Sequence, residues 1–140
     1  MIEFVDLTPE LLKGIEPQPA QRMPPDMYAQ ALAAPTGGAK AALVDGVPIA
    51  AAGVLELWPG RGHAWALLSV HAGPHLGAIT RAIRRQLEAL PLRRIEMAVD
   101  AQFPEAVRWA YMLGFECETP EPMRNYLPNG GACYLFARVH

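Results

Sequence analysis

Length, composition and charge restrict the chain to a few broad classes. With 140 residues, of which 51% are hydrophobic and 19% charged, it has the size and composition of one globular domain over 1–140 and is unlike a disordered segment. The formal net charge of −2 gives no general reason to expect nucleic acid as a partner, and the longest apolar run, Ala64 to Val70, is far shorter than the about 20 residues that cross a bilayer.

The N-terminus and the two cysteines indicate a compartment and give little support to a metal site. The N-terminus carries neither the basic region nor the cleavage site of a secretion signal, so a cytoplasmic location is expected. Cys117 and Cys133 both fall in predicted strands and could be neighbours across a sheet as small buried thiols. Their spacing fits neither a redox pair nor a zinc site, so no metal is predicted.

The first half of the chain reads as a strand, two short helices and an antiparallel meander. Thr8 caps the first helix and Gly14 ends it. A proline-rich connection leads to a second helix at 27–33, and an Asp45-Gly46 turn favours a β-hairpin. The strands of this half are predicted at 2–5, 39–44, 47–57 and 63–70.

The second half alternates strands with amphipathic helices. A helix over 78–90 with one apolar stripe, a strand over 94–99, a helix over 104–113 ended by Gly114 and a closing strand over 132–139 are expected. In the last helix Val107, Ala110 and Tyr111 are expected to face inward. A meander followed by a strand–helix–strand crossover predicts an α+β fold of three layers around a mixed sheet.

The loop at 71–77 is the first place to expect a ligand. A loop that leaves a strand and opens a helix directs backbone N–H groups and the positive end of the helix dipole at one point, which suits a phosphate. His71 and His75 lie in this loop, where either could act as a base or a phosphate donor. A metal bound by both is disfavoured, because the intervening Gly73-Pro74 opposes a helix there.

The order of elements resembles the GCN5-related N-acetyltransferase (GNAT) superfamily over nearly the whole chain. The segment AVRWAYMLGF at 106–115 is similar to the family's Ala-x-x-x-Tyr-x-x-x-Gly-Phe pattern. Shorter words resemble GNAT-like proteins of tailed phages and prophages, including the internal virion protein A-like family; they are AWALLSV at 64–70, ITRAIRR at 79–85, and Met123-Arg124.

The resemblance implies that acetyl-CoA binds where the strand ending at Val70 diverges from the strand at 95–99, and that its acetyl group passes to an amine. The CoA contacts it implies are Ser69, Val70, Gly73, His75, Leu76, Gly77 and Ala78. Tyr111 is the candidate general acid, and the strand carboxylates Glu56 and Glu96 are candidate general bases. Each has a structural alternative: a tyrosine packed on the sheet with its hydroxyl at the rim, and carboxylates that face solvent.

Three departures from the family pattern keep two functions open. The family's phosphate loop reads Gln/Arg-x-x-Gly-x-Gly/Ala, and this chain departs from that pattern at two positions whether Gly77 is aligned with its first or its second glycine. Ala110 stands at the family's tyrosine position, and Phe103 stands at its asparagine position. The chain is therefore either an acetyl-CoA-dependent N-acyltransferase or a phage or prophage protein that keeps the fold without catalysis and binds virion proteins. A generic domain for another anionic ligand is a third interpretation, and edge strands that pair between subunits make a homodimer possible.

Overall fold

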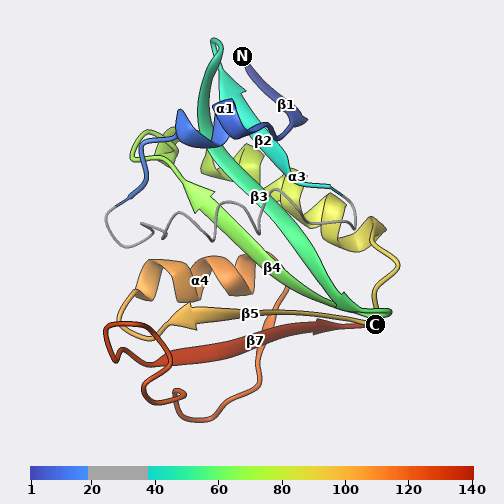
Figure 1. Cartoon of the computed structure of the whole chain (residues 1–140), viewed down its shortest axis with the longest axis vertical. Helices are drawn as coiled ribbons and strands as arrows, with labels where there is room; N and C mark the ends of the chain where they lie inside the picture. Colours follow the sequence, from blue (N-terminus) through green and yellow to red (C-terminus); the bar gives the residue numbers. More distant parts are fainter. Residues whose placement is uncertain (19–37) are drawn as a thin grey trace.

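A seven-stranded mixed sheet organises the chain in the order β1-β2-β3-β4-β5-β7-β6 (Figure 1). The computed structural model describes residues 1–18 and 38–140, so the helix expected at 27–33 lies outside the described residues. Within the described part of the chain, β4–β5 is the only parallel pair, and the other neighbouring strands are antiparallel. The predicted α+β fold with a meander and a crossover is confirmed.

The meander follows the turn chemistry of the sequence. Its strands are β1 (Ile2–Asp6), β2 (Lys40–Val44), β3 (Val47–Trp58) and β4 (Arg61–Leu68). Asp45 and Gly46 adopt φ angles of 51° and 79°, as a tight hairpin turn requires. Between β1 and β2 lies α1 (Pro9–Lys13), where the Thr8 hydroxyl accepts a hydrogen bond from the Leu11 N–H at 3.2 Å.

The crossover and the C-terminal hairpin complete the sheet. Their elements are η2 (Gly73–His75), α3 (Leu76–Ala89), β5 (Arg94–Asp100), α4 (Pro104–Met112), β6 (Glu116–Cys117) and β7 (Cys133–Val139). The helix α3 begins two residues before the expected position because a 3-10 turn runs directly into it, which places Gly77 in its first turn. Gly114 ends α4 with φ +90°, as predicted.

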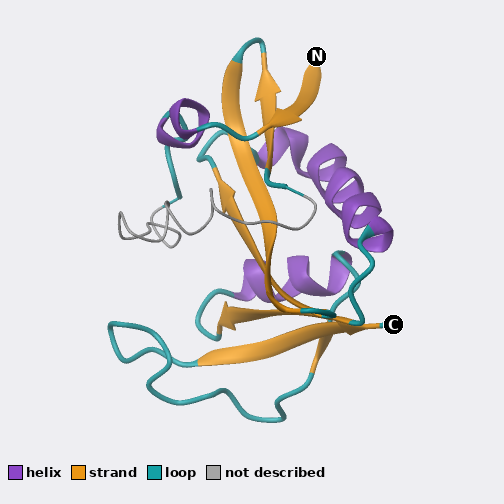
Figure 2. Cartoon of the chain, turned by 45° about the vertical axis from the view of Figure 1, so that its right-hand side comes forward, coloured by secondary structure: helices purple, strands orange, loops and turns teal. Residues whose placement is uncertain are grey.

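Helices cover both faces of the sheet. Leu12 of α1 packs against Ala51 and Leu67 on one face. On the opposite face, called the helix side below, α3 and α4 pack against the sheet through Leu87, Ala110 and their neighbours (Figure 2). Among the helices of residues 1–18 and 38–140, none combines the length and apolarity of a membrane span.

The two cysteines lie in adjacent strands without facing each other. Cys117 on β6 pairs with Phe136, whereas Cys133 pairs with Asp100 on the other side of β7. Both thiols are free, and burial raises the pKa of Cys133 above its ordinary value, with Asp100 adding to the shift. They therefore behave as small packed side chains.

Candidate functional site

The parallel strands β4 and β5 separate soon after they start. Their register pairs are Arg61↔Arg94, Gly62↔Ile95 and His63↔Glu96, and beyond these β4 continues to Leu68 while β5 continues to Asp100 without further pairing between the two. The other edge of β5 stays paired with β7 as far as Asp100 (Figure 1). The divergence that the family resemblance implies at this place is present, and His63 and Glu96 mark its closed end.

Glu96 is the centre of an ion-pair cluster at the closed end. Its side chain is 8% exposed, accepts a hydrogen bond from Arg94 Nε at 2.7 Å and is ion-paired with Arg61; Arg94 also contacts Glu118. Burial raises the pKa of Glu96, but hydrogen bonds from both guanidinium groups outweigh burial, so the net shift is downward. A carboxylate held this way is a poor proton acceptor, which disfavours the expected role of Glu96 as general base.

His63 is a functional candidate that the sequence analysis missed. It is the last residue of β4 that pairs with β5, and it stands opposite Glu96 in the register. Burial lowers the pKa of His63; Glu96 raises it in part, and Arg61 lowers it further. The neutral imidazole is therefore favoured at neutral pH. The sequence contains a signal that could have identified His63: it is a histidine within an apolar strand that leads to the glycine loop.

Tyr111, Glu56 and Glu96 are not brought together. Tyr111 is 55% exposed, and its ring lies 5.1 Å from that of Phe136 on the helix side of β7, so its expected inward position is wrong. Ile95 and Met97 pack into the helix-side core, so the intervening Glu96 faces the other side of the sheet. Glu56 lies on β3, opposite Gly62.

The end of β4 is partly covered by the chain itself. The Gln18 N–H donates to the Leu68 carbonyl at 3.2 Å, and the Val70 N–H donates to the Glu16 carbonyl at 3.0 Å. Ser69 is buried; its N–H donates to Ile49 on β3, and its hydroxyl accepts from His71. Successive residues of a strand alternate the edge toward which their backbone groups point, so Leu68 and Val70 offer theirs on the β5 side. Residues 16–18 thus occupy the wide end of the divergence.

The loop before α3 offers an open backbone surface. A Cβ built on Gly73 meets no described heavy atom within 4 Å, and one on Gly77 meets only Arg81 Nη1 at 3.7 Å. The first turn of α3 contains no acidic residue, and its N-cap His75 makes no side-chain cap. The N–H groups near Gly73, Gly77 and Ala78 therefore remain the best local donors to an anion, with Leu76 between them.

On the helix side, Trp109 spans the space between α3 and α4. Its indole N–H donates to the Thr80 hydroxyl at 2.8 Å, and that hydroxyl donates to the Leu76 carbonyl at 2.6 Å. Trp109 also packs against both helix-side core clusters. This side chain narrows access to the divergence from the helix side. Among the described residues, no group of three His, Cys, Asp or Glu side chains could hold a metal.

Comparison with solved structures identifies the fold. Over 99% of this chain, the ribosomal-protein-S18-alanine N-acetyltransferase of Escherichia coli aligns with a TM-score of 0.76 and 16% identity, covering 94% of that protein. Arabidopsis thaliana Naa50, in complex with the bisubstrate analogue CoA-Ac-MVNAL, aligns with a TM-score of 0.77 and 18% identity over 99% of both chains. A spermidine N-acetyltransferase chimera of Vibrio cholerae SpeG and hSSAT aligns with a TM-score of 0.73 and 14% identity, over 99% of this chain and 95% of that protein. No protein-family model and no curated protein matches the sequence. The chain has the GNAT fold.

Proposed function

We propose that the chain is an N-acyltransferase that moves an acetyl group from acetyl-CoA to an amine. The observation that carries the proposal is the divergence of β4 from β5 next to the glycine-containing start of α3, within a GNAT fold. The positive end of α3 and the N–H groups of Gly73, Gly77 and Ala78 would receive the pyrophosphate of CoA. The path of the cosubstrate would be lined by Ser69, Val70, His75 and Leu76. The backbone N–H of Val70 would not contribute a hydrogen bond to it, because that N–H already donates to Glu16.

We assign the general base to His63 in place of Glu56 and Glu96. The amine nitrogen attacks the thioester carbonyl carbon, and the imidazole takes a proton from that nitrogen. The carbon–sulfur bond then breaks, the acyl–nitrogen bond remains, and the imidazolium returns the proton to the departing thiolate. A free thiol has a pKa of about 8.5, so its thiolate leaves without the direct help of a tyrosine. Tyr111 is not needed in this scheme.

Binding of acetyl-CoA is the direct test. Calorimetry should detect it, and a ligand at 100 times its dissociation constant stabilises the folded state by about 2.7 kcal/mol, which moves the melting temperature upward. Gly77→Asp should abolish binding because it places a carboxylate against the pyrophosphate. Gly77→Ala, whose methyl group has room, should retain it. Neither heat nor a thermal shift at millimolar acetyl-CoA would refute the proposal.

Turnover is tested with two classes of amine. The structural neighbours include proteins whose names specify a ribosomal-protein alanine and spermidine as acceptors, so a peptide N-terminus and a polyamine are the first candidates. Release of the CoA thiol, followed with a thiol reagent, should require the amine and should fall in His63→Gln.

A second candidate function is supported by two observations. Residues 16–18 cover the wide end of the divergence, and Ala110, with 0% exposure, leaves no tyrosine at the family's position. Both are expected if the fold serves as a binding module without catalysis, with virion proteins as partners. Genes for portal, tail or internal virion proteins beside this one, together with a failure to bind acetyl-CoA, would favour this second function.

A further inference from the structure

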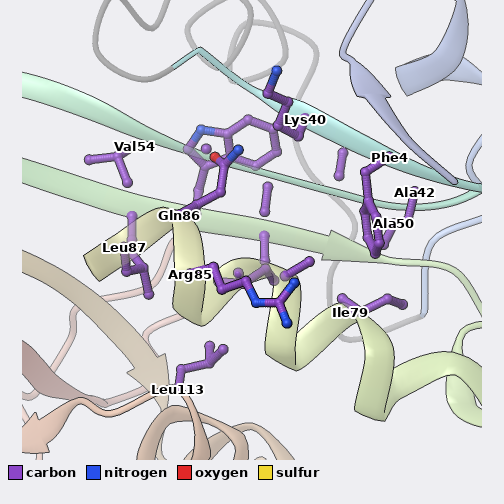
Figure 3. Close-up of a pocket in the computed structure, with 18 of the residues that line it drawn as sticks. Phe4, Lys40, Ala42, Ala50, Val54, Ile79, Arg85, Gln86, Leu87 and Leu113 are labelled. Atoms are coloured by element: carbon purple, nitrogen blue, oxygen red, sulfur yellow. The ribbon is translucent and has the colours of Figure 1, made fainter. Parts of the chain in front are cut away.

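An apolar groove of about 570 Å³ lies between α3 and the helix side of β2, β3 and β4 (Figure 3). The half-buried part of its floor is made of alanines, whose methyl groups reach only a short way toward α3; these residues are Ala52, Ala64 and Ala66. The ends of the floor, with Ala42, Ala50, Val54 and Leu68, are buried in the core that packs against α3. The wall contributed by α3 is also apolar, with Ile79, Ala82 and Leu87 facing the groove. The groove extends along α3 away from the glycine loop and reaches it at Ala78.

The charged residues of the groove are all cationic. Lys40, Arg81 and Arg85 line it, and no acidic side chain of the described residues does. Arg81 and Arg85 stand one helical turn apart, and neither makes an ion pair or a hydrogen bond with a described side chain. Lys40 contacts Asp6 but keeps 38% of its side chain exposed. Arg81 and Arg85, without partners among the described side chains and beside an apolar groove, complement a ligand with one anionic end.

The dimensions select the kind of ligand. A volume of about 570 Å³ falls within the range of about 300–1,000 Å³ that is usual for small-molecule sites. An α-helix, about 10–12 Å in diameter with its side chains, does not fit between α3 and its own sheet. Apart from the cations, the polar side chains of the described lining are Gln86, Trp65 and Trp109, and the Trp109 indole N–H already donates to Thr80. A strongly polar ligand would therefore leave most of its groups unpaired.

We propose that this groove binds a single-chain fatty acid. The hydrocarbon chain lies over the alanine floor beneath α3, and the carboxylate meets Arg81 and Arg85. This site is distinct from the proposed acetyl-CoA site, because its lining is the helix–sheet interface; the two share only Ala78, whose backbone N–H faces the loop in the first turn of α3.

The proposal is tested by displacement of 11-(dansylamino)undecanoic acid, a fluorescent carboxylate, from the whole chain. Unlabelled saturated acids of eight to sixteen carbons, below their micelle concentrations, should displace it. Affinity should rise about 15-fold for every two methylenes and level off when the groove is full, as expected for about 0.8 kcal/mol per buried methylene. The alcohol of equal length should bind about fivefold more weakly, because it lacks the charge.

Matched variants locate the site. Ala82→Trp should fill the groove and abolish probe binding, whereas Ala89→Trp, an exposed position on the same helix outside the groove, should not. The double variant Arg81→Glu with Arg85→Glu should weaken the binding of carboxylates but not that of alcohols. Arg124→Glu, on a remote exposed loop, should change the binding of neither. If Ala82→Trp does not fold by circular dichroism, Ala52→Leu replaces it.

Three results would each overturn the proposal: the absence of probe binding, unchanged binding in folded groove-filling variants, and equal affinity for the acid and the alcohol. Probe binding that is unchanged by millimolar acetyl-CoA would show that the groove is independent of the proposed CoA site, whereas competition between the two would contradict the assignment of the groove as a separate site.

Discussion

Glu96→Gln should destabilise the protein more than any other single change in the ion-pair cluster. The substitution leaves Arg61 and Arg94 beside a neutral side chain that is 8% exposed. Removing one partner of a buried ion pair costs about 3–5 kcal/mol, but both arginines are about 30% exposed, so we expect about 2–3 kcal/mol after solvent compensation. For a chain of this size that loss lowers the melting temperature by about 6–12 °C.

Urea unfolding at neutral pH measures this loss. The matched control is Glu118→Gln, which removes a carboxylate from the same Arg94 at a position that is 39% exposed. It should cost at most about 1 kcal/mol, as an exposed ion pair does. Equal losses in the two variants would refute the idea that Glu96 is the buried centre of the cluster.

The dependence on pH gives an independent check of the same reasoning. The pKa of Glu96 is lower in the folded protein than the ordinary value of 4.5, so its contribution to stability is complete above the unfolded pKa and is lost as pH falls through the folded one. The gap between wild type and Glu96→Gln should therefore close below pH 4.5, since a protonated glutamate resembles glutamine. A gap that stays constant down to pH 3 would contradict the assigned shift.

Three further predictions address the candidate site and the strand and helix next to it. Gly62→Ala should cost about 1–3 kcal/mol in urea unfolding, because its Cβ would lie 2.5 Å from Val54 Cγ1 and 2.8 Å from Leu92 Cδ1; an unchanged midpoint would contradict the tight packing at the closed end. Gly77→Ala should stabilise the protein by about 0.5–1 kcal/mol, since the position is helical and open, and a loss would mean that α3 starts later. In His63→Gln, kcat should fall about 100-fold, and the rise of kcat/KM with pH through the lowered pKa of His63, below 6.5, should disappear; a retained rise would exclude His63 as the base.

The fold was predictable because its signals are local. The Asp45-Gly46 turn, the Gly114 helix end and the apolar stripe of α3 each depend on residues close in sequence, and each is present in the structure. The first residue of α3 was harder to predict from the sequence. A 3-10 turn that continues into a helix keeps the glycine and proline composition of a loop, so composition alone places the helix start too late.

The site was less predictable because its chemistry depends on register. Glu96 meets Arg61 across the parallel pair of strands, 35 residues away, and only the pairing that starts at Arg61↔Arg94 brings the two together. The rotation of α4 also depends on distant contacts, among them the hydrogen bond from Trp109 to Thr80 and the packing of Ala110 in the helix-side core, and it leaves Tyr111 exposed. No spacing rule within one helix reveals either contact.

The two candidate functions differ in what binds to the edge of β4. The structure allows an estimate of how much affinity a ligand loses when it displaces residues 16–18 from that edge. An extended ligand that enters the divergence along β4 competes with Glu16 and Gln18 for the backbone groups of Leu68 and Val70. Two backbone hydrogen bonds contribute about 1–3 kcal/mol together, and the exposed Glu16–His71 ion pair adds little. Displacing them would weaken a micromolar ligand, whose binding free energy is about −8 kcal/mol, by about 5- to 150-fold. Residues 16–18 alone therefore reduce the affinity for acetyl-CoA without abolishing it. Complete loss of binding would have to come from the loop before α3, where the amides needed for the pyrophosphate lie.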